Sequence, residues 1–136
     1  MPIWIFDKIG LFATEYFIDL VDTEYSLRIR AAGYRIIDSK QAVLLHTAGN
    51  PQRHRLLWII PFTASHHSSM RRYYISRNRV VLFRKYWRRF PGWTGATVLE
   101  SLKETMKCFV GEADRWQKIR STWRGVRDGF AGKMGK

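Results

Sequence analysis

The stretch from Phe17 to Arg28 constrains the fold of this chain most, because it places three carboxylates directly after an apolar run. Asp19, Asp22 and Glu24 follow the aromatic and aliphatic side chains of residues 11–18. When an apolar run of this kind is buried, the carboxylates come up against a core. Asp22 stands where a helix over residues 22–32 should begin, and a glycine such as Gly33 commonly follows a helix end.

These acids have two interpretations. In the structural one, Asp22 caps the helix, which contributes about 1 kcal/mol, and Glu24 pairs with Arg28 on one helix face for a few tenths of a kcal/mol. In the chemical one, three acids at the start of a helix hold one carboxylate ready as a general base. The residues alone favour the structural interpretation.

Short motifs follow one another in a fixed order over roughly residues 8–90. They are Gly10-Leu11-Phe12, Tyr16-Phe17-Ile18-Asp19, Val21-Asp22-Thr23-Glu24, Arg28, Ala32-Gly33-Tyr34-Arg35-Ile36, Leu45-His46 with Gly49, and Arg71-Arg72-Tyr73-Tyr74-Ile75-Ser76-Arg77-Asn78-Arg79. Their order and spacing resemble the acceptor-side half of family 2 glycosyltransferases, in the rhamnosyltransferase-like branch. Ala13-Thr14 departs from the family, which more often has an acid pair there.

The resemblance implies an α/β fold, with this chain forming the C-terminal part of a GT-A (Rossmann-like) domain. The acceptor-side part would cover residues 1–67 and a basic helical extension residues 68–136. Only 21 residues precede Asp22, so we expect the nucleotide-binding half to lie outside the chain, which would then be a truncated form. Such a fragment is expected to be inactive alone.

The resemblance also implies roles for particular residues. Asp22 would be the catalytic base, with Asp19 as the alternative, while Glu24 and Arg28 would fix the start of the helix. His46 would help to hold a divalent metal, Mg or Mn, together with ligands in the missing half. The activity implied is inverting transfer from a nucleotide-sugar donor such as dTDP-rhamnose to a glycan or polyprenyl-linked acceptor, in the synthesis of a cell-surface polysaccharide.

The basic block that starts at residue 71 mixes arginines with aromatic rings. Arginine forks match phosphate groups well, and tyrosines can stack on a sugar or a lipid headgroup. We therefore expect a phosphate- or acceptor-binding surface made of Arg71, Arg72, Tyr73, Tyr74, Arg77 and Asn78. A solvated helix face is the ordinary alternative for such a charge run. His66 and His67 are expected to be solvated or to face phosphate.

Charge is distributed very unevenly along the chain, which has a net charge of +13. Residues 1–50 hold five Lys/Arg and six Asp/Glu, whereas residues 51–136 hold nineteen Lys/Arg and five Asp/Glu. A basic half indicates a polyanionic partner, so a non-catalytic module that binds nucleic acid or an anionic membrane is the alternative function. The acid cluster and the absence of a nucleic-acid motif argue against nucleic acid.

Membrane insertion and secretion are not expected. The sequence has no apolar run long enough to span a bilayer, and its N-terminus lacks a basic segment like that of a signal peptide. The single Cys108 excludes an internal disulfide and fits a reducing compartment. We expect a cytoplasmic protein, peripheral at the inner face of the plasma membrane.

The remaining elements follow from periodicity and breakers. Short strands are predicted at 34–37 and 42–45, forming the edge of a mixed sheet, and 56–60 is a strand or a buried helical turn. Three basic amphipathic helices should follow: residues 70–87 ending at Pro91-Gly92, a helix opened by Thr97 and Glu100, and residues 116–130. The last two form either an interfacial pair on a membrane or a plain helical hairpin.

Overall fold

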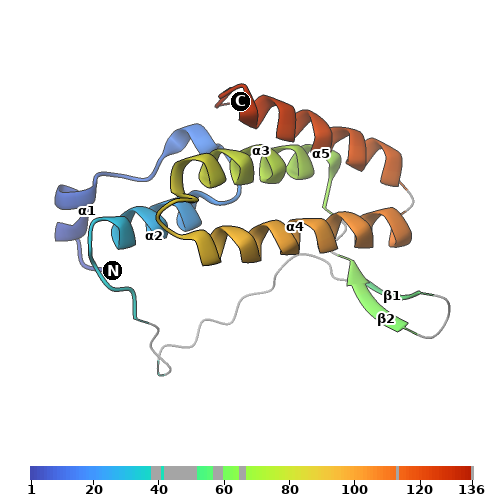
Figure 1. Cartoon of the computed structure of the whole chain (residues 1–136), viewed down its shortest axis with the longest axis horizontal. Coiled ribbons are helices and arrows are strands. Elements are labelled where there is room, and N and C mark those ends of the chain that lie inside the picture. The colour runs from blue at the N-terminus through green and yellow to red at the C-terminus, as the bar shows by residue number, and fades with distance from the viewer. Residues whose placement is uncertain (38–40, 42–51, 57–59, 65–66, 113, 136) are drawn as a thin grey trace.

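The computed structural model describes residues 1–37, 41, 52–56, 60–64, 67–112 and 114–135 (Figure 1). The elements in chain order are α1 (Trp4–Ile9), the 3-10 helix η1 (Thr14–Tyr16), α2 (Val21–Ala31), β1 (Gln52–Leu56), β2 (Ile60–Ala64), α3 (Ser69–Tyr86), α4 (Pro91–Gly111) and α5 (Arg115–Phe130).

The long helix α3 is the centre of the molecule, and α5 packs along it in the same direction (Figure 1). Two glycines allow the close approach. A Cβ on Gly125 would lie 2.3 Å from the carbonyl oxygen of Tyr73, and one on Gly129 would lie 2.7 Å from that of Arg77. Since real Cβ atoms do not come this near to backbone, only glycine fits at these two places.

The N-terminal segments join the same helical assembly. Tyr16 and Leu27 pack against Leu82 and Tyr86 of α3 in one buried cluster. A second cluster, made by Ile5, Tyr25 and Ile29, joins α1 to α2. Residues on both sides of the predicted division at 67/68 therefore share a core, and the division itself stays a prediction.

The predicted α/β class is wrong. The described residues are mostly helical, and their strands form only a two-stranded antiparallel hairpin, with Gln52 opposite Ala64 and Leu56 opposite Ile60. Tyr34–Ile37 is not a strand: Ile36 and Ile37 are exposed, and no described strand lies beside the segment to pair with its backbone. The structure thus shows no Rossmann-like layer or mixed-sheet edge in its described part. The predicted strand at 42–45 lies outside the described residues.

The helix over 22–32 is confirmed to within one residue as α2, but Asp22 does not cap it. The residue before the helix is Leu20, in a left-handed conformation with φ 64°, and no side chain caps this end. The Asp22 carboxylate instead accepts a hydrogen bond from the Thr23 amide at 2.9 Å. The cap prediction failed because the backbone of the loop before α2, which has positive φ at Phe17, Asp19 and Leu20, fixes where the helix begins.

The helix predicted at 70–87 is confirmed as α3, and the Ser68 hydroxyl caps it by accepting a hydrogen bond from the Arg71 amide. α3 ends at Tyr86, before Pro91 as predicted, but the predicted start of the next helix at Thr97 is wrong, because α4 begins at Pro91. A proline fits the first helical turn, where its fixed φ suits the helix and no N–H is needed. Thr97 consequently lies inside α4, where its hydroxyl donates to the Trp93 carbonyl at 2.9 Å. The last helix is confirmed as α5.

Within the part of the chain that the structure covers, no helix is long and apolar enough to cross a membrane.

Candidate functional site

The loop in front of α2 holds a strained backbone. Phe17, Asp19 and Leu20 all have positive φ, at 60°, 62° and 64°. Such angles cost free energy for residues other than glycine, so surrounding contacts must hold them in place. The side chain of Asn78, which is fully buried in α3, supplies those contacts. Its amide nitrogen lies 2.9, 2.9 and 3.0 Å from the carbonyl oxygens of Tyr16, Ile18 and Asp19.

Arg77, the residue before Asn78, fixes this amide. Its Nε and Nη2 donate to the Asn78 side-chain oxygen at 3.1 and 3.0 Å. The same guanidinium donates to the backbone carbonyls of Glu15, Tyr16 and Gly135. Arg77 and Asn78 therefore act as one clamp on the loop.

Asp19 is also held by α3. Its two carboxylate oxygens accept from Nε and Nη2 of Arg71 at 2.9 and 2.8 Å. This bond and the charge of Asp19 raise the pKa of Arg71, although burial acts in the opposite direction. The bidentate geometry leaves Asp19 engaged in holding the loop.

Glu24 lies inside the structure, with an exposed fraction of 0%. One carboxylate oxygen accepts from Lys85 Nζ at 2.8 Å and from the Tyr86 hydroxyl at 3.2 Å. The other lies 3.1 Å from Nη2 of Arg28. Burial lowers the pKa of Lys85, but the hydrogen bond and charge of Glu24 outweigh it and the pKa is raised. Glu24 thus connects α2 to α3.

Arg28 joins α2 to the end of α1. Its guanidinium donates to the carbonyls of Ile9 at 3.0 Å and Leu11 at 2.8 Å, around Gly10. The roles expected for Glu24 and Arg28, which were to fix the start of α2, agree with these positions, although neither role has been tested.

Asp22 has a different environment from the other two acids, because it is exposed and lines a cavity of about 650 Å³. The cavity lies between α1, α2 and the segment Tyr34–Ile37. Its walls carry four aromatic rings and, besides Asp22, one further charged residue, Arg35. The aromatic residues are Trp4, Phe12, Tyr25 and Tyr34. The rings contact one another: Phe12 and Tyr25 have centroids 4.5 Å apart, and Trp4 and Tyr34 5.7 Å apart.

None of these four aromatic residues was predicted to belong to a site. Tyr34 and Phe12 lay within the motifs of the resemblance, and that was the signal available. Trp4 was inconspicuous because nothing in the sequence shows that α1 folds back beside α2.

The residues of α3 expected to bind phosphate or the acceptor do not line this cavity. Arg72, Tyr74, Arg77 and Asn78 are buried. Arg72 donates to Glu112 at 2.8 Å, and the Tyr73 hydroxyl donates to Asp128 at 3.0 Å. In the structure these side chains tie α3 to the loop before α2, to the end of α4 and to α5.

The expected metal has no visible site here. His46 lies outside the described residues, and the described ones contain no group of three or more His, Cys, Asp or Glu side chains able to hold an ion. Apart from Asp22, the described residues that line its cavity include no carboxylate or histidine that could bind a metal.

Comparisons with known proteins give one partial relative. No family model matches the chain, and no solved structure matches it. The chain is 33% identical over 81 residues to a protein named dTDP-rhamnosyl transferase RfbF, from Shigella flexneri. The match covers 60% of this chain but 26% of that relative, so the chain spans about a quarter of the relative's length. The similarity to a glycosyltransferase is supported at this coarse level.

Proposed function

We propose that this chain supplies the acceptor-binding side of a glycosyltransferase that uses a nucleotide-sugar donor such as dTDP-rhamnose. One observation carries the proposal: the single exposed acid of the Asp19, Asp22 and Glu24 cluster lines a cavity with aromatic walls. Aromatic faces offer an apolar platform for the C–H face of a sugar ring, and a carboxylate accepts its hydroxyl groups. The partial similarity to a protein named as a rhamnosyl transferase supports the same activity.

In the proposed reaction, Asp22 accepts the proton of an acceptor hydroxyl. The oxygen, carrying the electron pair of its former O–H bond, forms a bond to the anomeric carbon of the donor sugar. The bond from that carbon to the diphosphate breaks at the same time, and the nucleoside diphosphate leaves with the electron pair. Attack from the face opposite the leaving group inverts the configuration at this carbon.

In this proposal the three acids have different roles. Asp19 is held by both donors of Arg71, and Glu24 is buried among its cationic and phenolic partners. Asp22 is free of both constraints and faces the cavity. The clamp of Arg77 and Asn78 on the preceding loop fixes where α2 begins, and hence where Asp22 stands.

The test is the transfer of labelled rhamnose from dTDP-rhamnose to endogenous glycan in membranes from cells of the native host that express the protein. Asp22→Asn should lower transfer by about 10²- to 10⁴-fold, because that is the usual contribution of a positioned base. Asp7→Asn, a change at another exposed acid, serves as the matched control. Full transfer by Asp22→Asn would refute the assignment, as would a loss confined to Asp19→Asn.

A second role, docking on an anionic membrane, is favoured by the outer face of α4. Four large apolar side chains there share one stripe and stay exposed: Leu99 by 53%, Leu102 by 59%, Met106 by 69% and Phe109 by 47%. Lys103 and Lys107 lie on the same helix, and Arg115 begins the next. Apolar residues flanked by basic ones are typical of a helix lying in a membrane interface, here at the inner face of the plasma membrane.

Vesicle flotation tests this second role. The protein should float with vesicles that contain anionic lipid and much less with neutral ones, and Met106→Glu should reduce the floating fraction several-fold. Thr94→Glu, near the start of α4 and outside the stripe, introduces the same charge as a control. A shift of DNA or RNA at the same salt concentration, without flotation, would instead favour the nucleic-acid function.

A further inference from the structure

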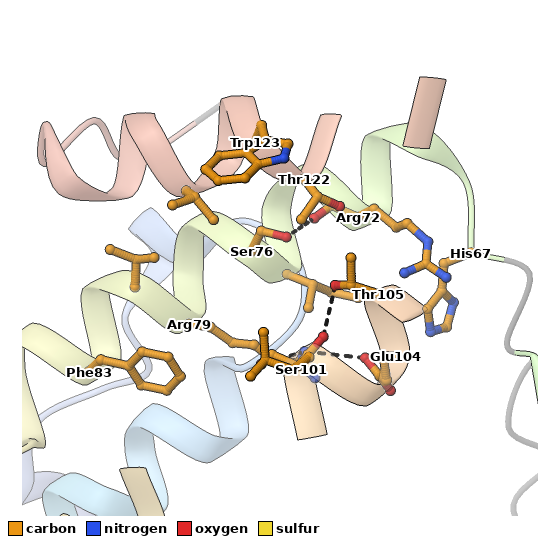
Figure 2. A pocket seen from close by; sticks show the side chains of 14 residues that line it. His67, Arg72, Ser76, Arg79, Phe83, Ser101, Glu104, Thr105, Thr122 and Trp123 are labelled. Carbon is orange, nitrogen blue, oxygen red and sulfur yellow. Dashed lines mark hydrogen bonds and ion pairs between the residues drawn. The ribbon is translucent and has the colours of Figure 1, made fainter. Parts of the chain in front are cut away.

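A second cavity, of about 260 Å³, lies between α3, α4 and α5 (Figure 2). It shares no lining residue with the cavity at Asp22. Most of its wall is apolar, contributed by Ile75, Val80, Phe83, Leu102, Trp123 and Val126. Figure 2 shows Trp123 above the cavity and Phe83 at the end opposite His67.

The other end of the cavity is polar and cationic. Arg72, Arg79 and His67 line it, together with Glu104 (Figure 2). Arg79 donates to the Ser101 hydroxyl at 3.0 Å and to Glu104 at 3.2 Å. Burial and the neighbouring charges of Arg71 and Arg72 lower the pKa of His67, which favours the neutral imidazole.

The two arginines are incompletely satisfied. Nε of Arg72 and Nε of Arg79 are both buried and have no hydrogen-bond partner among the described residues. The Arg72 side chain is only 8% exposed. A buried guanidinium donor without an acceptor is unfavourable, and an anionic oxygen is the acceptor that suits it best.

The charges near this end do not cancel. Glu112 receives both Arg72 at 2.8 Å and Lys118 at 2.5 Å, so one carboxylate serves two cations. Among the described residues, Glu104 forms an ion pair with Arg79 alone. The cluster of Arg72, Arg79, Lys118, Glu104 and Glu112 thus carries one excess positive charge, and an additional anion would balance it.

We propose that this cavity binds an amphipathic anion, a molecule with one phosphate or carboxylate head and a short apolar chain. The head lies at Arg72, Arg79 and His67, and the chain lies along the wall towards Phe83 and Trp123. A purely apolar molecule would leave the excess charge uncompensated, and a free phosphate would leave the apolar wall empty. The cavity is small, close to the lower size limit of ligand pockets, so it suits one chain rather than a two-chain lipid.

Calorimetric titration of the 136-residue chain with decyl phosphate and with decanoate, both below the concentrations at which they form micelles, tests this site. Both probes should bind. Decanol and inorganic phosphate, which each supply one half of the ligand, should bind at least about tenfold more weakly, because charge-assisted hydrogen bonds and apolar contacts are both required.

Two variants locate the binding. Arg79→Gln removes a head contact and Thr105→Phe fills the cavity from α4, and each should weaken decyl phosphate binding by about tenfold or more. Arg120→Gln, which removes a charge from an exposed position on α5 outside the cavity lining, should leave the affinity unchanged. Thermal melting shows whether each variant is folded. If one of the two fails to fold, the affinity of the other variant for decyl phosphate tests the proposal.

Four results would overturn the proposal. Three are no binding of either probe, equal binding of decanol and decyl phosphate, and unchanged affinity in a folded Arg79→Gln or Thr105→Phe protein. The fourth is an Arg120→Gln protein that binds as weakly as Arg79→Gln, because the probe would then recognise general surface charge. None of these results depends on transferase activity.

Discussion

Arg71 holds Asp19 through two hydrogen bonds, of 2.9 and 2.8 Å, across 52 residues of sequence. The pair joins the start of α3 to the loop before α2, and the Asn78 amide holds the same loop a little further along α3. This arrangement explains why three acids so close in sequence have different environments. Asp19 holds the loop in place through Arg71, Glu24 links α2 to α3, and Asp22 faces the aromatic cavity.

The buried carboxylate of Glu24 should be important for stability. Glu24→Gln keeps the shape of the side chain but leaves Lys85 and Arg28 without their counter-charge. We expect the free energy of unfolding to fall by about 2–3 kcal/mol, towards the lower end for a broken buried pair because Lys85 is half exposed. Urea denaturation measures the change. Glu100→Gln, at an exposed position, should differ little from wild type, and an equal loss in both variants would contradict this role.

The stability of the fold should depend on pH through Glu112. Burial alone raises the pKa of this carboxyl, but hydrogen bonds and charges from Lys118 and Arg72 outweigh it, and the pKa is lowered. The folded state therefore favours the ionised form. This contribution is present above the unfolded pKa of about 4.3 and is lost as the pH falls through the folded pKa.

Glu112→Gln should accordingly be less stable than wild type at pH 7, by about 3 kcal/mol. The difference between the two proteins should shrink as the pH falls below about 4.3. Urea unfolding at a series of pH values between 7 and 3 measures it. A difference that stays constant over this range would show that Glu112 acts through shape rather than charge.

The aromatic wall of the Asp22 cavity should contribute to sugar binding. Trp4→Ala is expected to weaken binding of a rhamnose-containing disaccharide by about tenfold, since a stacked aromatic ring contributes about 0.5–1.5 kcal/mol beyond its buried area. Nuclear magnetic resonance titration of the chain measures the affinity. Trp87→Ala removes an equally exposed ring outside the cavity, 52% exposed against 50% for Trp4. Equal effects of the two changes would argue against a sugar site at Asp22.

The sequence predicted best those elements whose signals are local. The helices α3 and α5 have apolar spacing over several turns, α2 is followed by the stop signal of Gly33, and serine, as at Ser68, is a common helix cap. The start of α4 was missed because Pro91 is compatible both with a helix end and with a first helical turn, and only the packing of Phe90 and Trp93 against the core selects the second. The α/β class came from the resemblance, and no local pattern in the chain could correct it.

The site was less predictable, because its geometry depends on contacts between distant residues. Asp22 lines a cavity, but its catalytic role stays a prediction. The basic block of α3 looks like a phosphate surface in the sequence, yet Arg71, Arg72 and Arg77 meet partners 40 to 61 residues away. Charge runs along a chain do not reveal such partners, and the aromatic cavity likewise forms only when α1 folds beside α2.

Two glycine substitutions should change the stability of the protein in opposite directions, because only one of the two glycines lies at the close contact between α3 and α5. In Gly125→Ala, the new Cβ would stand 2.3 Å from the Tyr73 carbonyl oxygen, so the helices must move apart. Overpacking of this kind costs about 1–3 kcal/mol, and we expect a loss in that range or above it. Gly95 lies inside α4, and no described atom from another part of the chain comes within 4 Å of the position where a Cβ would stand. Gly95→Ala should therefore stabilise the protein by about 0.5–1 kcal/mol through helix propensity. Thermal and urea denaturation of both variants measures these two changes in stability. A neutral or stabilising Gly125→Ala would contradict the tight helix contact, whatever Gly95→Ala does.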